Sequence, residues 1–349
     1  MYGRYVVKRI LYGIVTYMVI ILIYSALFNA VMDTTLKTQI SEQIQSKIMA
    51  VSRQGTMDDQ EIKNYQQELK NNLYKQYHLN DPILLRIFWR AVDTISFNFG
   101  KATAMSSSSG EKMVFDIIRE AIPRTILLFT FATIINLFIG ILFGLKKAQK
   151  PGELMDQSSS IMTMIVYGMP SWWLGMIMIM LLVYFIPLFP SGGIHASPPP
   201  EGIFYFLDLL YHMTLPVLTL VIIGFWGTSY LVRNIVLGTL QEDYIMAARA
   251  RGSSENKVLY GHALRSSAPP IVTMAVMSLL FSFGGNIIFE GVFSWPGMGN
   301  LYWVAVRTND LPVLMGNLAI TTLFYLSGYV LLDIIYGYLD PRIKVGGKA

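Results

Sequence analysis

The sequence has no cysteine among its 349 residues and only four histidines. Without cysteine the chain has no disulfide bond, no thiolate metal site and no cysteine nucleophile. The histidines are scattered, and none has the spacing to a carboxylate that builds a metal site, so we expect each to be structural or interfacial. The patterns G-x-x-x-x-G-K-[S/T] and H-E-x-x-H are also missing, which excludes a phosphate loop and a zinc-protease helix. The histidines are His78, His195, His212 and His262.

Charged residues are scarce as well. They make up 14% of the chain, whereas 53% of the residues are hydrophobic, a composition too apolar for an ordinary soluble globule. Six uncharged runs are each roughly 20 residues or longer, the length that an α-helix needs to cross the hydrocarbon core. We therefore predict an all-α, multi-pass membrane protein, in which the third run holds one span at about 161–187. The runs are 10–32, 125–145, 157–200, 209–232, 266–289 and 311–332.

The positions of the basic residues predict the topology. The net charge of +5 would suggest a nucleic-acid partner in a soluble protein. Here the basic residues gather before the first run and after the second, fourth and sixth runs, so we expect no nucleic acid. By the positive-inside rule these segments face the cytoplasm, together with both termini, in the inner membrane. The first run is long and has no evident cleavage site after it, so we expect a retained helix rather than a signal peptide.

The pattern divides the chain into four segments. Residues 1–32 form the cytoplasmic N-terminus and first span, and 33–118 a small extracytoplasmic domain. Residues 119–340 form the membrane core with a cytoplasmic loop at 239–268, and 341–349 a cytoplasmic tail. In the extracytoplasmic domain the spacing predicts amphipathic helices at 61–77 and 82–97, followed by a flexible linker at 102–110. The domain is either a structural cap or a surface that receives a delivery protein.

Ionisable residues are almost missing inside the runs, where proton- and ion-coupled transporters usually carry them. Glu290 and Asp333 lie at the ends of the fifth and sixth runs. This disfavours a secondary transporter or channel that works alone, and the lack of a nucleophile–base pair disfavours a membrane hydrolase. Small residues in the runs, such as Gly140 with Gly144, are typical of close helix packing, with a glycine-lined passage as the alternative.

The segment FEGVFSWPGMGN, which follows the fifth run, allows two interpretations. Its Phe293 and Trp295 suit a membrane interface, and its proline and glycines predict a turn, so it could be a plain interfacial loop. Alternatively, it is a gate near the outer mouth, held by Glu290 through a hydrogen bond or an ion pair. The candidate pathway and gate residues are Gly284, Gly285, Asn286, Glu290, Trp295, Pro296 and Gly297.

The polar loop 241–270 is the most distinctive part of the sequence. Good helix formers at 241–251 are followed by Gly252, which predicts helix, turn, helix. Its small residues Ala247, Ala248 and Ala250 would let another protein approach closely. We interpret this short helix as a docking site for a partner.

This loop, DYIMAARARGSSENKVLYGHALRSSAPP, resembles the EAA loop of ABC-importer permeases. It is most similar to the dipeptide and oligopeptide branch, in which the loop reads roughly D-Y-x-x-x-A-R-A-x-G followed by H-A-L-R. The stretches YHLNDPILLRIFW, FEGVFSWPGMG and YLDPRI also resemble that branch, so the similarity extends along nearly the whole chain.

The resemblance implies an ABC type I importer fold of six transmembrane helices, with a small extracytoplasmic domain between the first two. It implies a second, homologous permease, two cytoplasmic ABC ATPases that bind ATP and Mg, and an extracytoplasmic substrate-binding protein. The chain itself would hold no cofactor and would not be an enzyme. The implied substrates are di- and oligopeptides, with oligosaccharides or nickel as alternatives.

By position, the resemblance assigns 243–252 as the coupling helix that docks on an ATPase. Where the general family consensus has Glu and Pro, this chain has Met246 and Arg265. Arg265 fits the oligopeptide branch, whereas Met246 leaves open which side chain makes the polar contact. The implied ATPase-coupling residues are Asp243, Tyr244, Ala247, Ala248, Arg249 and Gly252.

Overall fold

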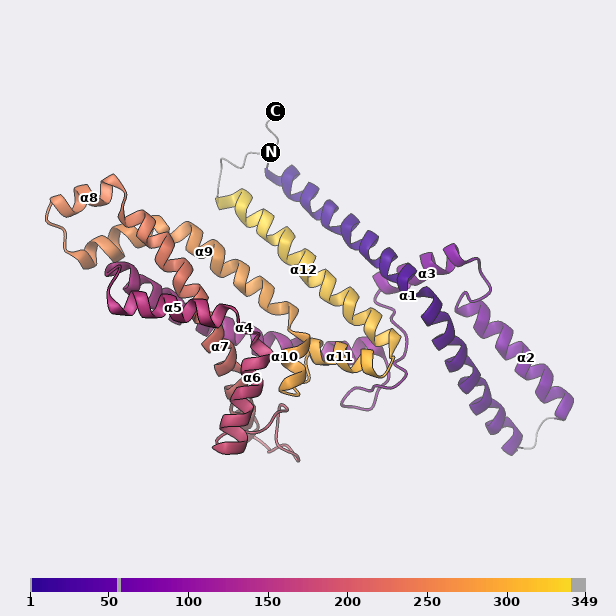
Figure 1. Cartoon of the computed structure of the whole chain (residues 1–349). Helices are drawn as coiled ribbons and strands as arrows, with labels where there is room; N and C mark the ends of the chain where they lie inside the picture. Colours follow the sequence, from indigo (N-terminus) through magenta and orange to yellow (C-terminus); the bar gives the residue numbers. More distant parts are fainter. Residues whose placement is uncertain (1, 55–57, 340–349) are drawn as a thin grey trace. The chain divides into compact units, whose positions relative to one another are not determined.

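The computed structural model of this chain describes residues 2–54 and 58–339. Their regular secondary structure is helical, apart from one isolated bridge between Lys101 and Met113, so the all-α prediction is confirmed (Figure 1). The described residues form two compact units, one from 2–54, 58–120 and 301–339, the other from 121–300. The predicted tail, 341–349, lies outside the described residues.

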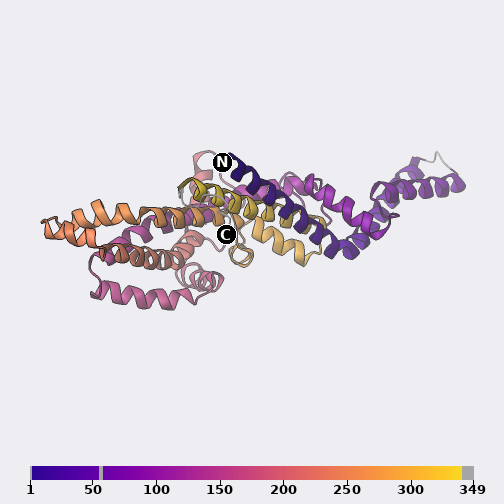
Figure 2. The same ribbon diagram turned by 90° about the horizontal axis from the view of Figure 1, so that it is seen from above.

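Two helices that run side by side dominate the first unit, α1 (Tyr2–Gln54) and α12 (Leu311–Leu339) (Figures 1 and 2). They approach closely at Gly13, where an added Cβ atom would lie 2.8 Å from Val330 Cγ2. The missing side chain is what allows this approach, as is common between helices in membranes.

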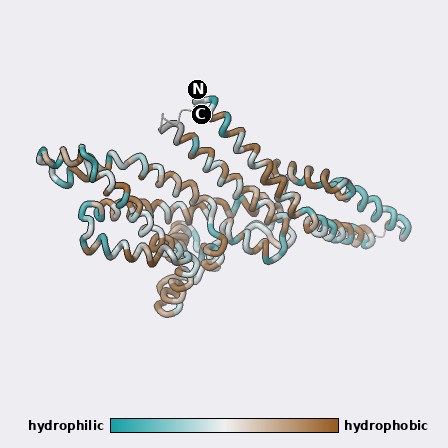
Figure 3. Tube along the Cα trace, turned by 45° about the horizontal axis from the view of Figure 1, so that its top comes forward, coloured by the Kyte–Doolittle hydropathy of each residue, from teal (hydrophilic) through white to brown (hydrophobic). Residues whose placement is uncertain are grey.

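Helix α1 continues well beyond the predicted first span. The apolar run ends at Met32, but the helix persists to Gln54 because residues 33–54 contain neither proline nor glycine. The predicted boundary at 32/33 therefore falls inside one helix, which changes from hydrophobic to hydrophilic along its length (Figure 3). The far part of α1 packs on α2 (Asp59–Gln76) through Ile40, Ile44, Leu73 and Leu79.

Helices α2 and α3 (Ile83–Ile95) match the two amphipathic helices predicted after the first run. Helix α3 is tied to α1 by Arg86 and Arg90, which both form ion pairs with Asp33. Arg90 also donates to the backbone oxygen of Asn29 at 2.9 Å. The charged side of α3 therefore faces α1.

The segment 102–110 is held by hydrogen bonds, and its prediction as a flexible linker is wrong. Asp310 Oδ2 accepts from the backbone N–H groups of Thr103, Ala104 and Met105 at 2.9, 2.8 and 3.2 Å. The composition was misleading because a buried carboxylate, distant in sequence, supplies the acceptor that this backbone needs.

The second unit contains most of α4 and the helices up to the start of α11. The predicted boundary at 118/119 falls inside α4, which is continuous across it. The helices and helical turns are α4 (Val114–Gln149), α5 (Leu154–Tyr167), α6 (Ser171–Ile179) with a π-helical turn (Met180–Phe185), α7 (Ile203–Leu240), α8 (Asp243–Ala250), a π-helical turn (Lys257–Ala263), α9 (Leu264–Phe281), α10 (Ile287–Val292) and α11 (Met298–Arg307).

Glycines bring α4 and α7 together. A Cβ atom added to Gly140 would lie 2.6 Å from the Thr228 side chain, and one added to Gly144 would lie 2.7 Å from the Ser229 backbone oxygen. These two glycines therefore serve helix packing, the first of the two interpretations of their spacing.

The third and fifth runs are interrupted. Helices α5 and α6 meet at a bend of 96° around Gly168 and Pro170, because proline cannot continue the hydrogen-bond ladder. The fifth run leaves the α-helix after Phe281, and Gly285, with φ +67°, completes the break. Among the described residues five helices are long and apolar enough to cross a membrane, or six if the bent pair is one span.

Candidate functional site

Helix α8, the predicted docking helix, is anchored in a hydrophobic core. Its Ile245 is fully buried and its Ala248 nearly so. The core joins α8 to the adjoining ends of α4, α7 and the helical segment that leads into α9, so α8 cannot move independently of those helices. The buried members are Leu145, Ala148, Val232, Val236, Leu240, Ile245, Val258, Leu259, Ala263 and Ile271.

The exposed face of α8 differs from the predicted one. Tyr244 and Met246 are 48% and 54% exposed, and Asp243 and Ala247 are exposed beside them. Ala248 points into the chain's own core, so it is not available to a partner. The three alanines cannot share one face, because successive residues of an α-helix are about 100° apart and Ala247 and Ala248 point different ways.

The turn after α8 is closed by local hydrogen bonds. Gly252 has φ +81°, a conformation that favours glycine. Its N–H donates to Arg249 O at 2.9 Å, and the Ser253 N–H donates to Ala248 O at 3.2 Å, which satisfies the last carbonyls of the helix. Arg249 also forms two hydrogen bonds with Glu255, of 3.0 and 3.1 Å. Arg249 thus stabilises the turn itself.

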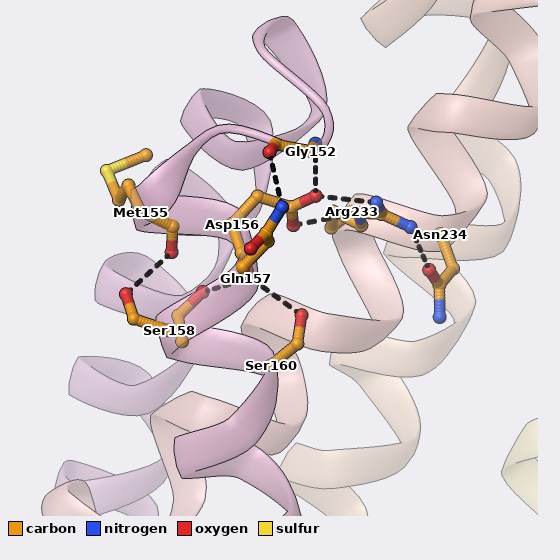
Figure 4. Close-up of polar contacts among 9 residues, drawn as sticks. Gly152, Met155, Asp156, Gln157, Ser158, Ser160, Arg233 and Asn234 are labelled. Carbon is orange, nitrogen blue, oxygen red and sulfur yellow. Dashed lines mark hydrogen bonds and ion pairs between the residues drawn. The ribbon is translucent and has the colours of Figure 1, made fainter.

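An ion pair between the half-buried Arg233 and the buried Asp156 joins α7 to α5 (Figure 4). Arg233 of α7 donates to Asp156 of α5 through Nε at 3.1 Å and Nη2 at 2.6 Å, and the Gly152 N–H donates to Asp156 Oδ2 at 3.0 Å. Lys147 of α4 is fully buried, and its Nζ has no hydrogen-bond partner among the described residues. The ion pair between Arg233 and Asp156 ties α5 to α7.

Sequence reasoning did not single out this ion pair. The signal was present, because Asp156 immediately precedes the third uncharged run and Arg233 immediately follows the fourth. Two opposite charges at run ends on the same predicted side of the membrane could have been paired.

At the other end of the second unit, a buried carboxylate organises the segment after the fifth run. Glu290 is fully buried and accepts hydrogen bonds from the N–H groups of Gly299 and Asn300 at 2.8 and 3.0 Å. The Thr125 hydroxyl of α4 donates to Glu290 Oε1 at 3.0 Å and accepts from the Met298 N–H at 2.7 Å. We call Thr125, Glu290, Gly297, Gly299 and Asn300 the Glu290 cluster.

Glycines surround this carboxylate. A Cβ atom added to Gly297 would lie 2.3 Å from Thr125 Oγ1 and 2.5 Å from Glu290 Oε2, and one added to Gly285 would lie 2.7 Å from Glu290 Oε1. Asn286 caps α10 by accepting from the Phe289 N–H at 3.0 Å. Five of the seven predicted gate residues are therefore Glu290 itself or its close neighbours: Gly285, Asn286, Glu290, Trp295 and Gly297.

The aromatic residues of this segment lie in a hydrophobic core of the second unit. Trp295 and Phe293 are both buried, and the indole Nε1 of Trp295 donates to Arg124 O at 3.0 Å. Both side chains therefore pack inside the protein, and the interfacial placement of this loop stays a prediction. Tryptophan suits an interface or a core equally well by composition, and the nearby backbone acceptor on α4 satisfies its N–H here.

Burial raises the pKa of Glu290 from its usual value of 4.5 to about 7. Desolvation of the charged form is the larger effect, and the hydrogen bonds from Asn300, Thr125 and Gly299 oppose it. Glu290 lies in α10, beyond the apolar segment that ends at Gly284. Among the described residues, hydrogen bonds are the interactions that favour its charged form.

Two of the scattered histidines meet on one carboxylate, which their spacing did not indicate. His195 Nδ1 lies 3.0 Å from Asp208 Oδ2, and His212 Nδ1 lies 3.3 Å from Asp208 Oδ1. Asp208 also accepts from the Ala196 N–H at 2.9 Å, so the group fastens the 195–196 loop to α7. Across 2–54 and 58–339, no group of three or more His, Asp or Glu residues could hold a metal ion.

Comparison with known proteins identifies the family. Residues 136–345 match the family described as "Binding-protein-dependent transport system inner membrane component". The oligopeptide transport system permease protein AppB of Bacillus subtilis (strain 168) is 31% identical over 275 residues, which cover 79% of this chain and 85% of that protein. The peptidoglycan transport system permease protein YejB of Agrobacterium fabrum (strain C58 / ATCC 33970) is 32% identical over 283 residues, or 79% of this chain and 76% of that protein.

Among solved structures, the inward-facing MetNI methionine ABC transporter resembles this chain with a TM-score of 0.45 and 16% identity, over 62% of this chain and 94% of that chain. The family match covers more than half of the chain, and AppB and YejB each exceed 30% identity over most of it. The chain therefore belongs to the family of inner-membrane components of binding-protein-dependent transport systems.

Proposed function

We propose that this chain imports peptides as one of two homologous permeases that together form the translocation pathway of an ATP-driven transporter. As a member of its family it is a transport component, not an enzyme, and it works with ATPase and substrate-binding partners. The name of the oligopeptide permease AppB supports peptides as the substrate. The peptidoglycan named for YejB keeps an oligosaccharide open as the alternative, and nickel is a second one.

The observation that carries the coupling role is the combination of exposure and anchoring in α8. Its Tyr244 and Met246 are available to a partner, whereas its Ile245 lies in a core shared with α4, α7 and the helical segment before α9. An ATPase that grips the exposed side would move those helices as one body. Closure of the ATPases on ATP would then favour one access state of the pathway over the other through differential binding.

In this proposal the chain has six spans, with α5 and α6 counted as one broken span. Both termini and α8 face the cytoplasm, because the basic residues gather on that side. Residues 33–118 are then extracytoplasmic and supply either a cap or a docking surface for the binding protein. The Glu290 cluster lies toward the opposite side from α8, where it holds the segment after α10 in place as part of an outer gate.

Reconstitution into vesicles tests the transport class. The permease pair, the ATPases and the binding protein are assembled, and uptake of a labelled oligopeptide is measured with and without ATP. Uptake that needs ATP and the separate ATPases supports the proposal. Uptake driven by a proton or sodium gradient without ATPases would instead identify a secondary transporter. Competition by unlabelled oligosaccharide or nickel distinguishes the alternative substrates.

A matched pair of substitutions tests the coupling helix. Tyr244 in α8 and Tyr260 in the following π-helical turn are 48% and 51% exposed, so Tyr244→Ala and Tyr260→Ala remove similar surface. We expect Tyr244→Ala to reduce ATPase co-purification and substrate-stimulated ATP hydrolysis severalfold, and Tyr260→Ala to leave both nearly unchanged. Equal effects of the two substitutions would contradict the assignment of α8.

A further inference from the structure

Helix α3 has an apolar face that nothing in its own unit covers. Leu84 is 78% exposed and Phe88, one turn further on, is 51% exposed. Leu85 and Trp89 are exposed beside them, so these four side chains share one side of the first two turns of the helix. A contiguous apolar patch of this kind on a polar segment marks a contact with another protein or with a membrane.

The charged residues of the same two turns point the other way. Arg86 and Arg90 are largely buried and form their ion pairs with Asp33 of α1. Neither arginine therefore lies on the exposed side of these two turns, and both serve to fix α3 on α1. Trp89 also stacks on the His78 ring, with centroids 5.1 Å apart, which limits the motion of its exposed edge.

The arginines also fix the depth of α3. Their partners on α1, Asn29 and Asp33, lie in the turn where the apolar run 10–32 ends. On the same part of α1, Leu27 and Val31 are exposed hydrophobic residues, as expected of a lipid-facing helix. Helix α3 is thus held where the hydrocarbon core meets the headgroups.

We propose that α3 lies in the membrane interface, with Leu84, Leu85, Phe88 and Trp89 in contact with the lipids around this end of the apolar run of α1. Tryptophan, phenylalanine and leucine on one face are the usual composition of interfacial helices and of the aromatic belt. The depth of this face in the membrane favours lipid over a soluble protein as its contact. A protein that docked at this level would have to displace lipid from the face. The placement does not depend on which side of the membrane this end faces.

The chain contains no cysteine, so single cysteines can be labelled without background. In the full-length protein, Leu84→Cys carries an environment-sensitive fluorophore on the proposed lipid face, and Phe88→Cys repeats the measurement one turn along. Gln66→Cys, exposed on the hydrophilic helix α2, is the matched control. Each variant is reconstituted alone into phosphatidylcholine–phosphatidylglycerol vesicles with and without lipids that carry a shallow nitroxide quencher.

We expect labels at 84 and 88 to emit at shorter wavelength and to be quenched severalfold more than the label at 66. Quenching at 84 and 88 no greater than at 66 would overturn the proposal. Protection of these positions from an aqueous quencher only after the substrate-binding protein is added would also overturn it, since the face would then be a protein-docking site. Elution of each variant as the same monodisperse peak as the parent confirms that folding is retained.

Discussion

The carboxylate of Glu290 accepts the backbone N–H of Gly299 at 2.8 Å and so closes the segment that follows α10 into a turn. The same side chain accepts the Thr125 hydroxyl, 165 residues earlier in the sequence, which ties that turn to α4. One buried side chain thus decides the conformation of a segment rich in glycine, for which many other conformations are open.

Removing the Glu290 side chain is predicted to destabilise the second unit strongly. Glu290→Ala leaves the N–H groups of Gly299 and Asn300 without their acceptor, and each unsatisfied buried group costs about 1–3 kcal/mol. Glu290→Gln keeps one acceptor oxygen for these donors, and its amide can donate to the Thr125 hydroxyl, so its cost should be about 1 kcal/mol. Thermal unfolding of the detergent-solubilised protein measures both variants. A Glu290→Gln variant as unstable as Glu290→Ala would contradict this account.

The titration of Glu290 should make the stability of the protein depend on pH. The pKa of Glu290 is about 7 in the folded protein against 4.5 ordinarily, so between these values the folded state binds more protons than the unfolded state. Stability therefore falls as pH rises from about 4.5 to about 7, by an amount on the order of 3 kcal/mol. Glu290→Gln should remove this component. The measurement is the difference in unfolding temperature between parent and variant at pH 5 and pH 8, and a difference that does not change with pH would contradict it.

Adding one methyl group beside the carboxylate should disrupt the cluster. In Gly297→Ala the new Cβ would lie 2.3 Å from Thr125 Oγ1, so the hydroxyl or the turn must move. We expect a loss of about 1–3 kcal/mol from overpacking, with reduced transport. Gly291→Ala is the control, because a Cβ atom there meets nothing within 4 Å. Thermal unfolding and vesicle uptake are measured for both, and equal losses would show that the packing around Glu290 is not the cause.

The ion pair near α8 should respond in opposite directions to two substitutions. Asp156→Ala leaves Arg233 and the buried Lys147 without their nearby negative charge, and breaking a buried pair costs about 3–5 kcal/mol. Lys147→Met replaces a fully buried cation, whose Nζ has no hydrogen-bond partner among the described residues, by an apolar side chain of similar length. It should be neutral or stabilising. Unfolding temperatures test both directions, and strong destabilisation by Lys147→Met would mean that the attraction between this cation and Asp156 outweighs the cost of its burial.

The local features of α8 were accessible from the sequence, whereas its orientation was not. Helix formers followed by Gly252 predicted the helix and its turn, and both depend on neighbouring residues only. Which side of α8 is buried depends on Leu145, Val232 and Ile271, which come from three other helices. The alanines alone could not show that Ala248 faces inward and Ala247 outward.

The Glu290 cluster shows the same limit at longer range. The sequence indicated that Glu290 could hold the following segment by a hydrogen bond, since the two are adjacent in the chain. The sequence could not identify Thr125 as a partner of Glu290, because the two residues are far apart in the chain. The burial of Trp295 likewise depends on a distant group, the backbone oxygen of Arg124, which accepts its indole N–H. Predictions therefore succeeded where the interaction is local and failed where the fold brings distant residues together.

Asp310 offers a test of that distinction in the first unit. Its Oδ2 accepts from three consecutive N–H groups, those of Thr103, Ala104 and Met105, and we predict that this contact orders residues 103–105 of the segment. Asp310→Ala should make these amides exchange hydrogen at least tenfold faster, because the acceptor shared by three donors is lost. Asp310→Asn keeps one oxygen and should show a smaller increase. Exchange of the α2 amides serves as the internal reference. Unchanged exchange at 103–105 in Asp310→Ala would mean that the segment is ordered by other contacts.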